Sequence, residues 1–173
     1  MWVAISSFLF SMVTIIAAFA TIAGFVINVI DRHNNKKHIQ DDTTYKLCGN
    51  FQQQVIPHFV RVFDMNSSLD VNIINKISYD METGDFYLPK LKNRTEYMAF
   101  LNEVMFLFNE MDEFAKKIQD GRVDIDLAYK LQGNTFCDII SSFKHLYDLY
   151  VELDGEAYKD LDKLYKLWNH RLQ

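Results

Sequence analysis

One short segment carries the only pair of side chains whose types and spacing suggest a chemical step. Arg32 and His38 form an Arg-x5-His element. A histidine can act as general acid and base on a ribose 2′-hydroxyl, while an arginine stabilises the charge that develops on the phosphate. That chemistry would be RNA cleavage without a metal. Because positions six apart do not share one helix face, the two side chains would have to converge across two protomers. The competing interpretation is a membrane-proximal basic cluster, with Arg32, Lys36 and Lys37, that sets topology and meets lipid headgroups.

No other motif predicts catalysis, a cofactor or a metal site. The chain contains no P-loop, GxGxxG, GxSxG or HExxH sequence. Its histidines do not pair at metal-binding spacing, and Cys48 and Cys137 fit no zinc motif. Two free thiols suit a reducing compartment and are expected to be buried. We therefore favour a non-enzymatic protein, with a metal-independent ribonuclease as the alternative.

The charged residues are distributed unevenly along the chain. Residues 1–30 contain no Lys, Arg, Asp or Glu, so the net charge of −5 belongs to the rest. Duplex-binding domains are normally basic, so DNA is not an expected partner. The uncharged run exceeds the roughly 20 apolar residues that span a bilayer, and it lacks the basic start of a signal peptide. The sequence thus predicts a transmembrane helix over residues 1–30, with Trp2 as an interfacial anchor.

The flanking charges predict the orientation of this helix. Arg32, Lys36 and Lys37 follow it, and only the α-amino group precedes it. By the positive-inside rule the C-terminal part lies in the cytoplasm, so we expect a single-pass protein of the bacterial inner membrane.

A polar stripe runs along the predicted transmembrane helix. Its members recur at the spacing of about 3.5 residues that is typical of supercoiled helices. They are Ser7, Ser11, Thr14, Thr21 and Asn28. Lipid offers these side chains no hydrogen-bond partner, so such a stripe tends to face other helices or water. Three interpretations remain: hydroxyls bonded to their own backbone, a helix contact in a homo-oligomer, and the lining of a pore. The last two require several copies of the chain.

The rest of the chain predicts a helical bundle. Residues 31–44 form a juxtamembrane stalk, which either continues the membrane helix or ends at a cap formed by Thr43 or Thr44. Residues 45–173 form the helical cytoplasmic domain. In its first half we expect a helix to Phe63 kinked at Pro57, a short helix capped by Ser67-Ser68, and an extended segment at 86–89. Three helices follow: one from Asn93 to Gly121, one capped by Asp124 with a weak point at Gly133-Asn134, and a last one over Tyr158–Trp168. The fold class is therefore all-α.

With one N-terminal span, a small helical domain and the Arg-x5-His element, the chain resembles the membrane-anchored accessory protein of type VI-B CRISPR systems. The resemblance implies a divergent HEPN-like motif at Arg32 and His38. It also implies an oligomeric membrane pore that acts in antiviral defence alongside an RNA-guided RNase or its RNA. HEPN motifs normally lie on a helix of the soluble bundle, whereas Arg32 and His38 adjoin the membrane. More generally, the chain is similar to bacterial single-span helical proteins of unknown function.

These observations lead to one expectation and two alternatives. We expect an oligomeric membrane effector or accessory protein of antiviral defence, forming a pore that depolarises or permeabilises the inner membrane. The alternatives are a membrane-tethered HEPN-like ribonuclease and a non-catalytic membrane scaffold. The expected partners are membrane lipid, further copies of the chain, and an RNA-guided RNase or its RNA.

Overall fold

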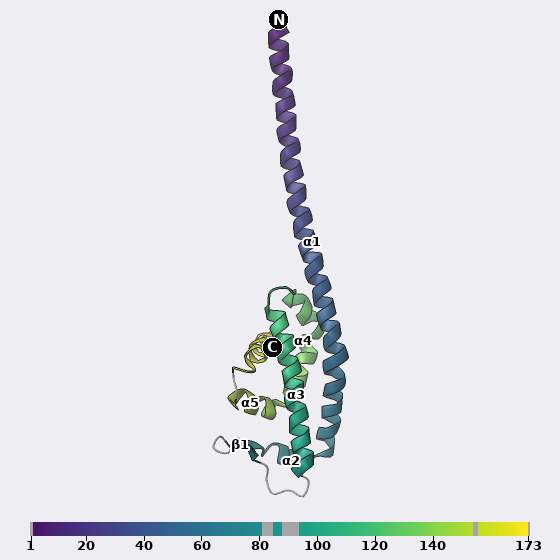
Figure 1. Ribbon diagram of the computed structural model, residues 1–173, viewed down its shortest axis with the longest axis vertical. Coiled ribbons are helices and arrows are strands. Elements are labelled where there is room, and N and C mark those ends of the chain that lie inside the picture. The colour runs from purple at the N-terminus through teal and green to yellow at the C-terminus, as the bar shows by residue number, and fades with distance from the viewer. Residues whose placement is uncertain (1, 81–84, 88–93, 154–155, 173) are drawn as a thin grey trace. The chain divides into compact units, whose positions relative to one another are not determined.

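The computed structural model of the protein consists of helices and one small hairpin (Figure 1). It describes residues 2–80, 85–87, 94–153 and 156–172, with side chains from Gly24 onward except at residues 71, 79, 80 and 85–87. In chain order the elements are α1 (Trp2–Ser68), α2 (Val71–Ile74), β1 (Ser78–Asp80), β2 (Asp85–Tyr87), α3 (Arg94–Gln119), α4 (Ile125–Ser142), α5 (Lys144–Leu153) and α6 (Lys159–Leu172). The chain divides into two compact units, Met1–Gln40 and Asp41–Gln173, and α1 contributes to both. The predicted helical class is confirmed.

In the first unit, α1 presents an apolar segment to its surroundings. Every residue of the segment 24–30 is exposed, and all are apolar or glycine except Asn28. Phe25 is 71% exposed and Ile27 is 59% exposed. Among the residues whose side chains are described, no helix combines the length and the apolar character that crossing a membrane requires.

Helix α1 passes through the stalk without interruption. Residues 31–44 are helical throughout, and no new helix begins at Thr43 or Thr44. Thr44 is fully buried, and its hydroxyl accepts a hydrogen bond from the Asp124 N–H at 2.8 Å. This hydroxyl therefore serves the start of α4 rather than a cap on α1. Pro57 lies inside α1 as well.

In the second unit, α1 packs through one regular stripe of side chains. The buried members are Thr44, Cys48, Phe51, Val55, His58 and Val62. Their steps alternate between four and three residues, which is the spacing of about 3.5 that keeps a seam facing its neighbours. One of the six, His58, carries a strongly polar ring with two nitrogens and therefore needs hydrogen-bond partners.

Four helices of this unit meet at a cluster of aromatic rings. Phe51 of α1, Phe114 of α3, Phe136 of α4 and Trp168 of α6 each supply one ring. The contacting centroids lie 4.5 to 6.3 Å apart, and Phe136 meets Trp168 nearly edge to face at 77°. Large rings bury much apolar surface, and such pairs add roughly 0.5–1.5 kcal/mol beyond that burial. The cluster is the centre of the hydrophobic core.

Helix α3 confirms the face that its sequence predicts. The residues expected on one side are all buried: Tyr97, Leu101, Val104, Phe108, Met111, Ala115 and Ile118. The helix ends just before Gly121, whose φ of +80° suits a residue without a side chain.

Helix α4 begins as predicted but does not break as predicted. The Asp124 side chain accepts hydrogen bonds from two N–H groups of the first turn, at 2.9 Å each. The weak point at Gly133-Asn134 is wrong, because α4 continues to Ser142. Gly133 is buried there beside the Tyr129 ring of the preceding turn, and that ring packs on Trp168 of α6, so the packing outweighs the poor helix propensity of glycine.

The link between α1 and α3 differs from expectation at its first cap. Asp70, not Ser67-Ser68, caps α2, since its carboxylate accepts from the Asn72 N–H at 2.9 Å. The two serine hydroxyls instead donate back to carbonyl groups of α1. The extended segment is confirmed at β2, which pairs antiparallel with β1. Residues 88–89 and the predicted cap at Asn93 lie outside the described residues.

Substituting Gly133 with alanine is expected to destabilise the second unit. A Cβ atom at Gly133 would lie 2.4 Å from Cδ2 of Tyr129, whose ring packs on Trp168 at 5.9 Å. Alanine gains about 1 kcal/mol in helix propensity, whereas overpacking costs about 1–3 kcal/mol. Thermal unfolding should therefore give a lower Tm for Gly133→Ala. In a Tyr129→Ala background the same change should be neutral or stabilising. An equal loss in both backgrounds would contradict the clash.

Asp112 provides a pH-dependent prediction. Its carboxylate, on α3, accepts a hydrogen bond from the Leu161 N–H in the first turn of α6 at 2.8 Å. Burial raises the pKa of Asp112, nearby Asp160 and Glu113 add to the rise, and the Leu161 bond opposes it. A folded-state pKa above the unfolded value means that the folded state binds the proton more tightly. The resulting stabilisation is full below the unfolded pKa and is lost as pH rises through the folded pKa.

The amide variant should lack this loss. Asp112→Asn keeps an oxygen acceptor for Leu161 and cannot ionise. As pH rises above about 4, the free energy of unfolding of Asp112→Asn should therefore increase relative to that of wild type. Asp112→Ala removes the acceptor and should be about 1 kcal/mol less stable than Asp112→Asn at all pH values, because neither residue ionises. Urea unfolding of the three proteins at several pH values on both sides of about 4 measures both effects. If the stability of wild type increased relative to that of Asp112→Asn as pH rises, the pKa of Asp112 would be lowered rather than raised by folding.

Candidate functional site

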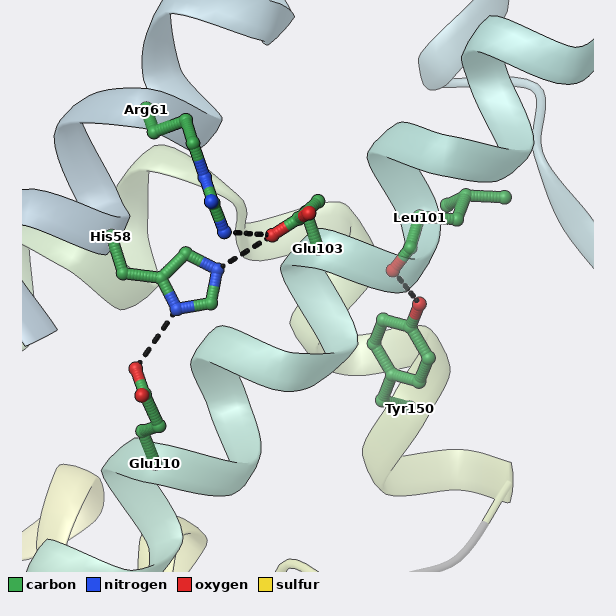
Figure 2. Close-up of polar contacts among 6 residues, drawn as sticks. All are labelled: His58, Arg61, Leu101, Glu103, Glu110 and Tyr150. Carbon is green, nitrogen blue, oxygen red and sulfur yellow. Dashed lines mark hydrogen bonds and ion pairs between the residues drawn. The ribbon is translucent and has the colours of Figure 1, made fainter.

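A polar cluster around His58 joins α1 to α3 (Figure 2). His58 lies on the buried stripe of α1, and only 7% of its side chain is exposed. Its Nε2 lies 3.0 Å from a Glu103 carboxylate oxygen, and its Nδ1 lies 2.9 Å from a Glu110 oxygen. The Arg61 guanidinium donates to the same Glu103 carboxylate. Figure 2 shows the ring of His58 held between the two carboxylates.

Helical spacing explains why these four side chains meet. Glu103 and Glu110 are seven residues apart, which is about two turns along one side of α3. Their carboxylates can therefore approach an imidazole from two ends. His58 and Arg61 are three residues apart on α1, so both point toward α3 from adjacent turns.

The geometry determines which hydrogen bonds are possible. An ionised carboxylate only accepts hydrogen bonds, and a neutral imidazole has a single N–H donor. An imidazolium has two donors and satisfies both carboxylates at once. In that form His58 and Arg61 balance the charges of Glu103 and Glu110.

This arrangement leaves His58 no route to act as a catalyst. A general base needs a nitrogen that faces the proton it removes. Both nitrogens of His58 are engaged, and the ring is almost fully buried. The cluster therefore acts as a hydrogen-bonded bridge that joins α1 to α3. Removing one partner of such a bridge leaves the other charges poorly satisfied.

A groove of about 250 Å³ lies beside the cluster, between residues 47–55 of α1 and 106–117 of α3. Phe51 and Phe114 contribute buried apolar surface to it, while Glu113 and Lys117 contribute opposite charges. Phe106 also lines the groove, and its ring is 56% exposed and lies 5.4 Å from that of His58. Pockets for drug-sized ligands measure about 300–1,000 Å³, so this groove is smaller than a typical ligand pocket.

The Arg-x5-His element is not brought together by the fold. Arg32 and His38 are exposed, and neither makes a polar contact with any residue that the structure describes. Six positions on a helix separate side chains by about 120° in rotation and about 9 Å along the axis. Within one chain the two cannot act on one phosphate.

The remaining predicted residues divide by what is described. The backbone at Trp2, Ser7, Ser11, Thr14 and Thr21 is part of α1, and their side chains lie outside the described residues. Asn28, Lys36 and Lys37 are exposed on the same helix. Over the described residues, no group of His, Cys, Asp and Glu side chains is arranged to hold a metal ion.

Both cysteines are buried, and their thiols are poor nucleophiles. Cys48 is 3% exposed and Cys137 is 2% exposed. Burial raises the pKa of each thiol to about 11, so little of the reactive thiolate forms near neutral pH. The thiols therefore fill core space rather than attack a substrate.

Comparisons of the chain with protein-family models, with curated proteins and with solved structures return no match. No residue role therefore transfers to this protein from a relative.

Double-mutant cycles should show that His58 is coupled more strongly to Glu110 than to Glu103. Glu103 keeps Arg61 when His58 is lost, whereas Glu110 keeps no other cation that the structure describes. For alanine substitutions we expect a coupling of about 1 kcal/mol or more between His58 and Glu110, and a smaller one to Glu103. Urea unfolding of the single and double variants measures it. The exposed pair Lys144–Asp148 is the control, and it should couple by only about 0.3–0.5 kcal/mol. Couplings no larger than this control would show that the bridge does not hold α1 to α3.

Proposed function

We propose that the protein is a membrane-anchored, non-catalytic effector that assembles through α1 into a pore in the bacterial inner membrane. The cytoplasmic bundle would carry the contacts to other partners. The observation that supports the anchor most directly is the exposed apolar segment 24–30 of α1. Seven consecutive helical residues cover every side of a helix. A helix that is apolar on all sides but for the narrow polar stripe at Asn28 is stable when it is surrounded by protein or by lipid.

The preceding sequence extends this segment to the length of a membrane span. From Trp2 to Ile30 the chain has no charged residue. At about 1.5 Å per residue this is roughly 43 Å of helix, against about 30 Å of hydrocarbon. Arg32, Lys36 and Lys37 follow at once and favour a cytoplasmic bundle.

The polar stripe supports assembly of several copies. Ser7, Thr14, Thr21 and Asn28 recur every seven residues, and Ser11 lies between the first two. In lipid these groups gain by facing another helix or water. Rings of hydroxyl and amide groups hold water without strong charge selectivity, as a depolarising pore requires. The resemblance to the type VI-B CRISPR accessory protein is what connects such a pore with antiviral defence.

The ribonuclease alternative gains no support from the site geometry. Arg32 and His38 lie on different sides of one helix, and His58 is engaged at both nitrogens. The scaffold alternative needs the anchor but gives the polar stripe no role, so conductance distinguishes it from a pore.

Substitution within the stripe should abolish depolarisation without preventing assembly. Thr21→Leu with Asn28→Leu makes the lining apolar and favours dewetting of the channel. The matched control, Val26→Leu with Val29→Leu, adds similar bulk outside the stripe. A potential-sensitive dye reports depolarisation in bacteria expressing each protein, and the size of the detergent-solubilised particle reports assembly. We expect depolarisation by wild type and the control only, at equal particle size.

Each contrary result has its own meaning. Extraction of wild type from membranes by alkaline carbonate would refute the anchor. Equal depolarisation by all three proteins would refute the stripe as the lining. An anchored wild type that never depolarises cells would refute the pore and favour the scaffold.

A further inference from the structure

The charged side chains that follow the apolar segment are not spread evenly around α1. All residues from 31 to 38 are exposed. A rotation of about 100° per residue places Arg32, His33, Lys36 and Lys37 within a sector of about 140°. We name these four residues the basic sector. The opposite side of the helix carries the carboxylate of Asp31, the amides of Asn34 and Asn35, and the imidazole of His38, but no Lys or Arg.

This sector contrasts with the charge of the rest of the protein. Residues 1–40 carry three Lys or Arg and one Asp, a net charge of +2, and the remaining residues carry −7. An anionic surface therefore repels the second unit and attracts the basic sector.

We infer that the basic sector binds the phosphate-bearing headgroups of anionic phospholipids. The inference rests on the proposed anchor, because Arg32 follows the last apolar residue, Ile30, by only two positions. When the apolar segment lies in the hydrocarbon, the sector lies at headgroup depth. The Arg32 guanidinium can bind a phosphate through two N–H groups, while Lys36 and Lys37 act as point charges.

A nucleic acid fits the sector less well than lipid. Proteins that bind single strands combine basic residues with aromatic rings on which bases stack. The sector contains no Phe, Tyr or Trp, and the chain around it is acidic overall. One-sided cationic residues directly after an apolar helix are instead typical of juxtamembrane lipid contacts.

The full-length protein in nanodiscs of equal parts phosphatidylcholine and phosphatidylglycerol provides the test. Native mass spectrometry counts each lipid that the released protein retains. Wild type should retain phosphatidylglycerol in preference to phosphatidylcholine. Each basic side chain near an anionic surface changes binding by about fivefold at low salt, so Arg32→Gln with Lys36→Gln and Lys37→Gln should lower the retained ratio at least about fivefold.

A matched control separates the sector from overall charge. Lys76→Gln with Lys116→Gln and Lys130→Gln removes the same number of charges from exposed positions of the second unit, and it should retain lipid as wild type does. Equal losses in both triple variants, or no loss in either, would overturn the inference. Two further results would overturn it. If the sector variant kept its lipid but formed smaller oligomers than wild type, the sector would face another protomer. If it kept its lipid but lost RNA that wild type retains, the sector would face a nucleic acid. Failure of wild type to enter nanodiscs would refute the anchor and this inference together, whereas a wild type that enters without lipid preference would refute this inference alone.

Discussion

The contact among four aromatic rings is the interaction on which the rest of the second unit depends. Phe51, Phe114, Phe136 and Trp168 come from four different helices, so no helix can shift without separating at least one pair of rings. The packing prevails even where it leaves a polar atom unsatisfied, because Nε1 of Trp168 is buried with no hydrogen-bond partner among the described residues. An unpaired buried donor costs roughly 1–3 kcal/mol, which the burial of so large a ring offsets.

The same contact determines which polar groups meet. Phe51 touches Phe114, and seven residues further along α1 the His58 ring meets Glu110, four residues earlier on α3. The two helices therefore run antiparallel, and the next pair in order is Arg61 with Glu103. A shift of either helix by one residue would carry His58 away from both carboxylates. The rings fix the register, and the ion pairs then penalise any other register.

Local patterns in the sequence predicted the main helices but not this cluster. The buried face of α3 follows from helical periodicity, and the Asp124 cap from one side chain and the turn after it. The partner of His58 depends on which side of a helix 45 residues away faces α1. A hint was available, since His58 follows the apolar spacing that continues from Val55 to Val62, and a polar side chain on such a stripe needs a partner. Gly133 misled for another reason: it leaves room for the Tyr129 ring one turn earlier on α4, and that ring is held by its tertiary contact with Trp168 of α6.

Several side chains of the second unit that could do chemistry instead make contacts within the bundle. His58 binds two carboxylates, and the Tyr147 and Tyr158 hydroxyls donate to Asp162 and Asn109. Burial and the neighbouring Asp162 raise the pKa of Tyr147 well above its ordinary value, so this phenol donates but does not ionise. Side chains used in this way are not available to substrates. What remains unengaged and chemically distinctive among the described residues is the exposed part of α1, apolar to Ile30 and one-sidedly basic from Arg32. A helix built in that order is suited to lipid, which is the physical basis of the proposed membrane anchor.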